Sequence, residues 1–204
     1  PEKVLSNADL EQTLDTSDEW IRTRTGIERR HIAAPGETTV DLAEHAARRA
    51  VEAAGVDPAE VDFIAFGTTT PDLVFPNCGV LLQARLGARG CPAFSIETAC
   101  SGFIYALSIA DKFIRAGEVK CALVVGAETL SRITDRSDRS TAILFGDGAG
   151  AVVLRPSAEA GVLSTHLHAD GEYRDLLYSR GGVSRGFLDP ETGEADIAIR
   201  MAGN

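Results

Sequence analysis

The sequence contains no long hydrophobic run and has fewer positive than negative charges. None of its apolar stretches approaches the roughly 20 residues that a membrane-spanning helix needs, so we expect no membrane segment. The first ten residues are polar and lack the apolar core of a secretion signal, which predicts a cytoplasmic protein. A net charge of −10 argues against a nucleic-acid partner, because such proteins carry a basic surface. The chain does not begin with Met, and we expect it to be trimmed at its front.

The four cysteines form no pattern that is typical of a metal site or of a disulfide framework. Cys78, Cys91, Cys100 and Cys121 include no CxxC pair. Because we expect the chain to stay in the cytoplasm, we also expect reduced thiols. At least one of the four thiols is then free to take part in chemistry.

What the sequence does contain is an alternation of strand and helix patterns. Hydrophobic residues make up 44% of the chain and charged residues 25%, the balance of a globular domain. Short apolar runs predict buried strands at 61–68, 93–96 and 121–125. Helical patterns, each followed by a glycine, predict helices at 38–54, 78–86 and 101–116. This order predicts a layered α/β fold around a largely parallel sheet, in one domain over 1–204.

The two ends of the chain carry weaker patterns. Helical turns are expected over 7–22, broken by a Thr-Ser-Asp segment at 16–18 that caps a second short helix. Towards the other end the residues favour β structure at 142–145, 151–154 and 162–168.

The segment FSIETACSGF at 94–103 is the strongest chemical signal, because it places Cys100 between a predicted strand and a predicted helix. A helix start offers free N–H groups and a positive dipole end, which favour a thiolate and an oxyanion. Ala99, Ser101 and Gly102 are small and would let a thioester approach. A free cysteine is also often a small buried hydrophobe, which is how we interpret the other three.

A cysteine nucleophile also needs a base or an electrostatic partner, usually a histidine. The chain offers His31, His45, His166 and His168, and no pattern connects any of them to Cys100. The residues alone therefore indicate a nucleophile but not the base or electrostatic partner that it needs.

Two further motifs have competing interpretations. The run HLHAD at 166–170 resembles a zinc-hydrolase motif, since His166 and His168 would share one face of a strand and Asp170 follows; a structural strand explains it better. The run FGDGAG at 145–150 lacks the lysine of a phosphate-binding loop, and we predict a tight turn between two strands.

Four arginines lie close together near the front of the chain. Charge patterning leaves open a solvated basic face or a site for an acidic partner. They are Arg22, Arg24, Arg29 and Arg30.

Taken together, six segments closely resemble the β-ketoacyl-acyl-carrier-protein synthase III family, in order along nearly the whole chain. They are TSDEWIRTRTGIERRHIA (16–33), GCPAFSIETACSGF (90–103), YALSIADKFIRAG (105–117), ALVVGAETLSR (122–132), FGDGAGA (145–151) and STHLHADG (164–171).

This resemblance implies a thiolase-like fold of two related α/β halves, of which the chain is the N-terminal half, and a homodimer. It implies that Cys100 accepts an acyl group, often acetyl, from coenzyme A. The acyl group is then condensed with malonyl-acyl carrier protein, which releases carbon dioxide and starts fatty acid synthesis. The coenzyme A thioester is a substrate, and the resemblance implies no metal or other cofactor.

The resemblance also implies roles for individual residues. Those expected to contact coenzyme A are Trp20 and Arg139, which sandwich its adenine, together with Arg24, Thr25 and Thr16. Stacking of adenine between an indole and a guanidinium is physically sound. Those expected to shape the acyl pocket are Phe75, which reaches across the dimer, and Leu144 and Phe145.

The chain departs from the family pattern in three ways. The family's catalytic His and Asn are expected beyond Asn204, and its first strand before Pro1. We therefore expect this chain to be acylated at most, with condensation requiring the rest of the reading frame. Glu97 and Thr98 stand where small apolar residues are common. Related enzymes prime polyketides or make alkylquinolones, so the resemblance does not decide which starter acyl group the enzyme uses.

Overall fold

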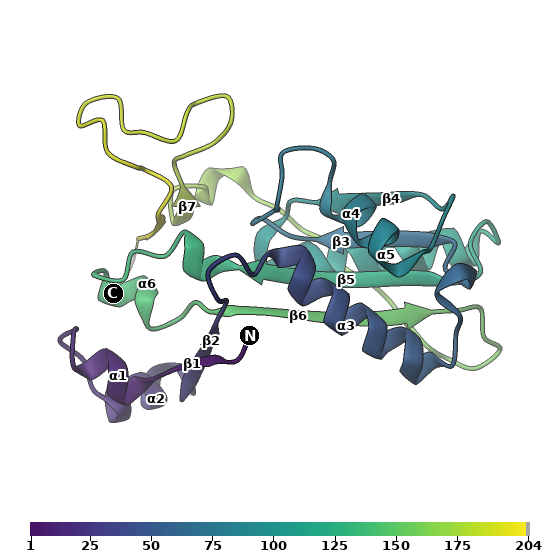
Figure 1. The fold of residues 1–204 in the computed structure, drawn as a ribbon, viewed down its shortest axis with the longest axis horizontal. Helices are drawn as coiled ribbons and strands as arrows, with labels where there is room; N and C mark the ends of the chain where they lie inside the picture. The colour runs from purple at the N-terminus through teal and green to yellow at the C-terminus, as the bar shows by residue number, and fades with distance from the viewer. Residues whose placement is uncertain (203–204) are drawn as a thin grey trace. The chain divides into compact units, whose positions relative to one another are not determined.

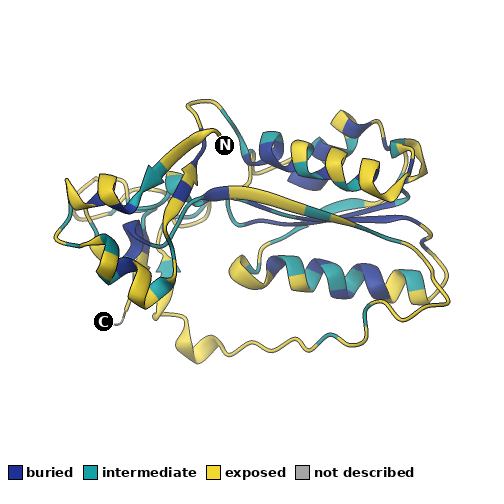
Figure 2. Cartoon of the chain, turned by 90° about the horizontal axis from the view of Figure 1, so that it is seen from below, coloured by how far each residue is buried: buried dark blue, intermediate teal, exposed yellow. Residues whose placement is uncertain are grey.

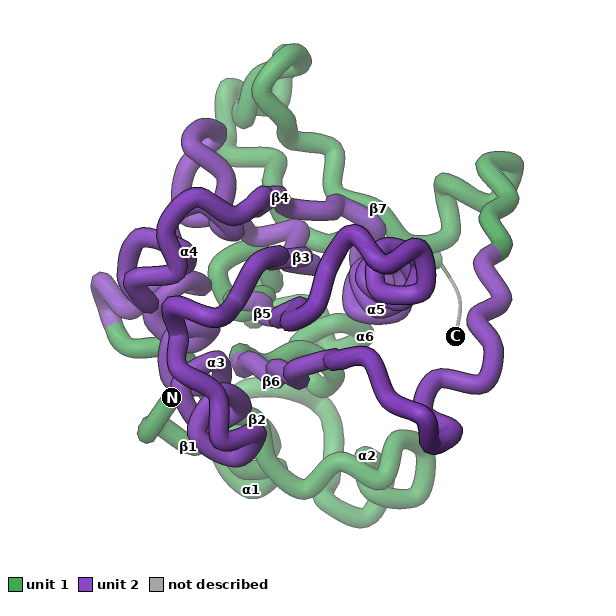
Figure 3. Tube along the Cα trace, turned by 90° about the vertical axis from the view of Figure 1, so that its right-hand side faces the viewer, with its two compact units in different colours: residues 1–34, 129–147, 168–204 green, residues 35–128, 148–167 purple. Residues whose placement is uncertain are grey.

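The computed structural model describes residues 1–202, which form two compact units (Figure 3). Unit 1 consists of three segments, 1–34, 129–147 and 168–204, and unit 2 of 35–128 and 148–167. Among residues 1–202, no helix is long and apolar enough to cross a bilayer.

The central sheet of unit 2 has four strands in the order β4-β3-β5-β6 (Figure 1). Their bounds are β3 Phe63–Gly67, β4 Ala93–Ile96, β5 Ala122–Thr129 and β6 Asp147–Leu154. Strand β3 pairs in parallel with both β4 and β5. Strand β6 runs opposite to β5 in Figure 1. The sheet is therefore mixed and largely parallel, as the sequence predicts.

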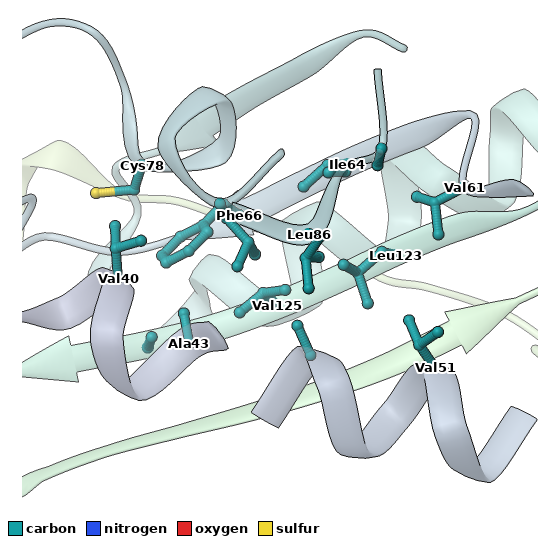
Figure 4. Close-up of a cluster of buried hydrophobic side chains, with 14 of the residues drawn as sticks. Val40, Ala43, Val51, Val61, Ile64, Phe66, Cys78, Leu86, Leu123 and Val125 are labelled. Carbon is teal, nitrogen blue, oxygen red and sulfur yellow. The ribbon is translucent and has the colours of Figure 1, made fainter. Parts of the chain in front are cut away.

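Helices cover both faces of this sheet. Residues of helices α3 (Thr39–Ala54) and α4 (Cys78–Leu86) belong to one buried cluster, and residues of helix α5 (Gly102–Arg115) to a second. Strand side chains alternate between the two faces, so Ile64 joins the first cluster and Phe63 the second. Figure 2 shows the sheet between two helix layers, and Figure 4 shows the first cluster.

The helices of unit 2 begin and end where the sequence predicts. The Thr38 hydroxyl accepts a hydrogen bond from the Asp41 N–H in a capping box at the start of α3, and Gly55 ends the helix at φ 62°. Helix α4 keeps its predicted bounds and ends at Gly87, and strand β4 also matches. Strand β3 is shorter than predicted, and β5 extends to Thr129.

Unit 1 contains shorter elements. Its strands are two antiparallel pairs, β1 Lys3–Ser6 with β2 Arg29–Ile32 and β7 Leu177–Ser179 with β8 Ile199–Met201. Its helices are α1 Asn7–Glu11, α2 Asp18–Thr25 and α6 Arg139–Ala142. Ser17 caps α2, which confirms the predicted break before a second short helix. Its small apolar core contains Leu10, Ile21 and Ile143.

Four single 3₁₀ turns complete the described elements. They are η1 Pro58–Glu60, η2 Ala99–Ser101, η3 Leu130–Arg132 and η4 Gly171–Tyr173.

Three expectations for the second half of the chain are wrong. Residues 142–145 form no strand, because the Asp138 side chain caps helix α6 there. Residues 162–168 form no strand either; the Val162 carbonyl accepts a hydrogen bond from Arg115 of α5 rather than from a neighbouring strand. The run at 145–150 is not a turn between strands, because β6 is continuous from Asp147 and includes Gly148 and Gly150.

Candidate active site

Cys100 lies in the 3₁₀ turn η2, between strand β4 and helix α5. Its residue is exposed, whereas Cys78 and Cys121 are buried and Cys91 is partly buried. Burial raises the pKa of the Cys78 and Cys121 thiols, so both favour the neutral form. Cys78 lies inside the apolar cluster of Figure 4. Among the four cysteines, Cys100 is therefore the exposed one.

The position of the turn depends on a close contact between two glycines. A Cβ atom added at Gly67, the last residue of β3, would lie 2.6 Å from the backbone carbon of Gly102. Gly102 is the first residue of α5, so the start of this helix lies directly against the end of β3. The same helix packs Phe103 against Gly126 of β5, where an added Cβ would lie 3.2 Å from the Phe103 Cβ. At Gly67 only glycine permits so close a backbone approach, and at Gly126 a larger residue would push the Phe103 side chain aside.

The residues just before Cys100 carry two unfavourable features. Ala99 has φ 44°, a left-handed conformation that non-glycine residues rarely adopt. The Thr98 hydroxyl oxygen is buried and, within residues 1–202, has no hydrogen-bond partner. Such costs are concentrated at functional sites in proteins.

The loop that follows β3 is held by one carboxylate. Glu128 of β5 accepts hydrogen bonds from three consecutive threonines, Thr68, Thr69 and Thr70, including the backbone N–H groups of Thr69 at 2.8 Å and Thr70 at 3.1 Å. This arrangement fixes the backbone directly after Gly67.

Unit 1 presents a different cluster, in which two guanidinium groups lie over one indole ring. The Arg24 Cζ is 4.7 Å and the Arg139 Cζ 4.9 Å from the centroid of Trp20. Arg24 is one helical turn after Trp20 on α2, which brings the two side chains together. Arg139 starts α6 and also donates a hydrogen bond from Nη1 to the Asp15 carbonyl at 2.9 Å. An electron-rich ring with two cations suits a planar, negatively charged ligand.

Comparisons with known proteins agree on one family. The family model described as 3-oxoacyl-[acyl-carrier-protein] synthase III matches residues 94–171. A β-ketoacyl-[acyl-carrier-protein] synthase III of Thioalkalivibrio sulfidiphilus is 59% identical over all 204 residues, and one of Xylella fastidiosa is 62% identical. The chain is similar over its whole length to β-ketoacyl-[acyl-carrier-protein] synthase III proteins. It spans 63% of the length of the first of these relatives and 62% of the second.

Solved structures confirm the fold. The synthase III of Aquifex aeolicus matches with a TM-score of 0.88 at 48% identity, covering 100% of this chain and 61% of that one. The priming β-ketosynthase of the R1128 polyketide pathway matches with a TM-score of 0.92 at 38% identity, covering 100% of this chain and 60% of that one. The thiolase-like α/β fold implied by the resemblance is therefore confirmed.

The four arginines near the front of the chain have different roles. Arg24 joins the indole, whereas Arg22 forms an ion pair with Glu28 at 2.9 Å. Arg30 is 3% exposed and faces the protein interior. Burial lowers the pKa of its guanidinium. The sequence alone did not separate these positions.

The other residues expected at the synthase III site are placed as follows. The Thr25 hydroxyl donates to the Ile21 carbonyl at 2.7 Å, and the Thr16 hydroxyl oxygen is buried without a partner among residues 1–202. Phe75 is 83% exposed in unit 2. In unit 1, Leu144 packs against the apolar core and Phe145 is partly buried.

All four histidines are exposed. His31 Nδ1 lies 2.7 Å from the Pro1 carbonyl oxygen, and His166 Nε2 lies 3.2 Å from the Ser164 hydroxyl. His166 and His168 do not share a strand face, because the segment is not a strand. Within the described part of the chain, no three His, Cys, Asp or Glu side chains are grouped to hold a metal.

Asp147, in the FGDG run, is a buried residue whose role is not evident from the sequence alone. Its carboxylate is 8% exposed and accepts hydrogen bonds from the Ala33 N–H at 2.6 Å, the Ser131 hydroxyl at 2.6 Å and the Ser131 N–H at 2.8 Å. An acidic residue between two glycines is the sequence feature that could have indicated a buried, hydrogen-bonded carboxylate at this position. Asp147 joins segments of unit 1 that are far apart in the sequence.

Proposed function

We propose that the full-length protein is a β-ketoacyl-[acyl-carrier-protein] synthase III. It transfers an acyl group from an acyl-coenzyme A to Cys100 and condenses that group with malonyl-acyl carrier protein, starting fatty acid synthesis. The observation that carries this proposal is the exposed Cys100 in a turn fixed by the Gly67–Gly102 contact. The names of the similar proteins support the same reaction.

In the first step the Cys100 thiolate attacks the thioester carbonyl carbon. A new C–S bond forms, the carbonyl oxygen becomes an oxyanion, and collapse of this intermediate releases the coenzyme A thiolate. The positive end of the α5 helix dipole is suited to stabilise both negative charges. The second step, condensation with malonyl-acyl carrier protein, requires the catalytic His and Asn that the family resemblance implies beyond Asn204.

Unit 1 supplies the residues proposed for coenzyme A. Trp20, Arg24 and Arg139 form a stacking surface for adenine, and the two arginines attract phosphates. Thr16 and Thr25 are proposed to contact the same substrate. We propose that Phe75, Leu144 and Phe145 shape the acyl pocket, and that the protein is a homodimer. The coenzyme A thioester is proposed as a substrate, with no metal or other cofactor.

A second candidate function is the priming of polyketide synthesis. The solved structure with a TM-score of 0.92 is described as a priming β-ketosynthase of a polyketide pathway. Acylation of Cys100 is common to both candidates, so the choice of starter distinguishes them. Preference for acetyl-coenzyme A favours fatty acid initiation, and preference for a specialised acyl-coenzyme A favours the polyketide role.

The test is the intact mass of the full-length protein after incubation with acetyl-coenzyme A. We expect the mass to rise by one acetyl group in the wild type and not in Cys100→Ala. Cys91→Ala is the matched control, because Cys91 is a partly buried cysteine outside the turn, and it should be acylated like the wild type. A mass increase that survives Cys100→Ala would disprove the assignment.

A further inference from the structure

Arg30 is a buried cation whose hydrogen bonds go to neutral groups. It lies in β2 and donates from Nε to the Ile143 carbonyl at 2.9 Å, and from Nη2 to the same oxygen. Its Nη1 donates to the Asn7 side-chain oxygen at 2.6 Å. Within residues 1–202, Arg30 forms no ion pair with a carboxylate. Burying a charge in this way is expensive, so its retention needs an explanation.

Asn7 continues the network on its other side. It is 1% exposed, and its Nδ2 donates to the Asp18 carboxylate and to the Ile27 carbonyl, each at 2.8 Å. A continuous hydrogen-bonded chain therefore runs from Ile143 through Arg30 and Asn7 to Asp18. Each member is fixed by at least one bond to a different segment of unit 1.

The two ends of this chain lie on the helices that carry the stacking cluster. Asp18 is the first residue of α2, which presents Trp20 and Arg24. Ile143 is the C-terminal cap of α6, which begins with Arg139. The network therefore connects the two helices whose side chains meet over the indole ring.

We propose that Arg30, together with Asn7, is a positioning pair that sets the spacing of Trp20 and Arg139 for the nucleotide part of the acyl-coenzyme A. This inference rests on the proposed function. The planar guanidinium bonds one carbonyl through two nitrogens and the Asn7 oxygen through a third, a geometry that the single ammonium group of lysine does not reproduce. Arg30 thus acts through the cluster and does not touch the substrate.

The test uses two acetyl donors for Cys100 in the full-length protein: acetyl-coenzyme A, and the N-acetylcysteamine thioester, which has no nucleotide. Arg30→Lys should raise the KM for acetyl-coenzyme A about tenfold, equivalent to roughly 1.4 kcal/mol of binding. The maximal acylation rate, and the rate with the short thioester, should not change. A variant that only weakens the fold would slow both donors.

Arg29→Lys is the matched control, since Arg29 belongs to the same sequence cluster and to the same strand β2 but is exposed. It should leave the KM unchanged. Asn7→Ala is a second variant, which breaks the link to Asp18 and leaves the two bonds from Arg30 to Ile143. It should raise the KM severalfold. Quenching of tryptophan fluorescence by coenzyme A, compared between the wild type and Trp20→Phe, measures binding at this cluster directly.

An unchanged KM in Arg30→Lys, or equal slowing with both donors, would overturn the inference. Failure of both variants to fold would also overturn it, because Arg30 and Asn7 would then serve the fold alone. If wild-type Cys100 accepts acetyl from neither donor, the proposed function itself is wrong. The outcomes for the two proposals are therefore distinguishable.

Discussion

The turn that carries Cys100 and the cluster around Trp20 are held in place by different kinds of interaction. Cys100 lies between a strand and the next helix, and backbone contact between Gly67 and Gly102 fixes it. The Trp20 cluster depends on side chains that bond across 113 residues, from Arg30 to Ile143, and across 124, from Arg139 to Asp15. A nucleophile can be presented by local backbone shape, whereas a stacking site for a large ligand needs distant side chains.

The cores of the two units also depend on different kinds of interaction. Unit 2 buries two apolar clusters on opposite faces of a sheet, which is stabilised mainly by hydrophobic burial. Unit 1 has a small apolar core, and the buried side chains of Asn7, Arg30 and Asp147 bind its segments together. We expect steric changes to damage unit 2 most and changes of hydrogen bonding to damage unit 1 most.

The largest effect is expected for Gly67→Ala. The added methyl group would overlap the Gly102 backbone at 2.6 Å, where no flexible side chain can move away. We expect a loss of about 3 kcal/mol in the free energy of unfolding, measured by urea denaturation, together with slower acylation of Cys100.

Gly148→Ala is the control for this change, because an added Cβ there meets nothing within 4 Å. It should alter the free energy of unfolding by less than about 0.5 kcal/mol. Equal effects of the two substitutions would contradict the role of the glycine contact.

A smaller effect is expected for Asp147→Asn in unit 1. The amide keeps the size of the side chain but presents N–H groups to donors at Ala33 and Ser131. Leaving buried donors unpaired should reduce the free energy of unfolding by about 2 kcal/mol, again measured in urea. Asp175→Asn is the control, since that side chain is 80% exposed, and it should be nearly neutral. A neutral Asp147→Asn would show that unit 1 does not depend on this carboxylate.

The smallest effect is expected for Thr98→Val, and it has the opposite sign. This change removes a buried hydroxyl without a partner in the described chain, so it should stabilise the protein by about 1 kcal/mol. Thr141→Val removes a buried hydroxyl that donates to Asp138 at 2.9 Å, and should destabilise by a similar amount. Thermal unfolding of the two variants measures this difference in stability. Destabilisation by Thr98→Val would show that the hydroxyl has a partner in solution.

Much of unit 2 was predictable because its signals are local. The capping threonine and the terminal glycine of α3 are neighbours of the helix that they delimit, and the continuous apolar run of β3 already indicates a strand with two buried faces. The strands predicted at 142–145 and 162–168 failed because apolar β-branched residues fit several environments. The Val162 carbonyl accepts a hydrogen bond from Arg115 of α5. No local sequence pattern predicts this contact between residues 47 positions apart.

The sequence by itself determined the order of strands and helices in unit 2, the place of Cys100 at a strand–helix junction, and the family. These depend on residues that are close together in the chain or on similarity along it. Only the tertiary structure decided which arginine lies over Trp20, which one is paired on the surface and which one is buried. The reason is physical: neighbouring arginines have the same charge and chemistry, and the buried one is distinguished by its bond to Ile143, 113 residues away.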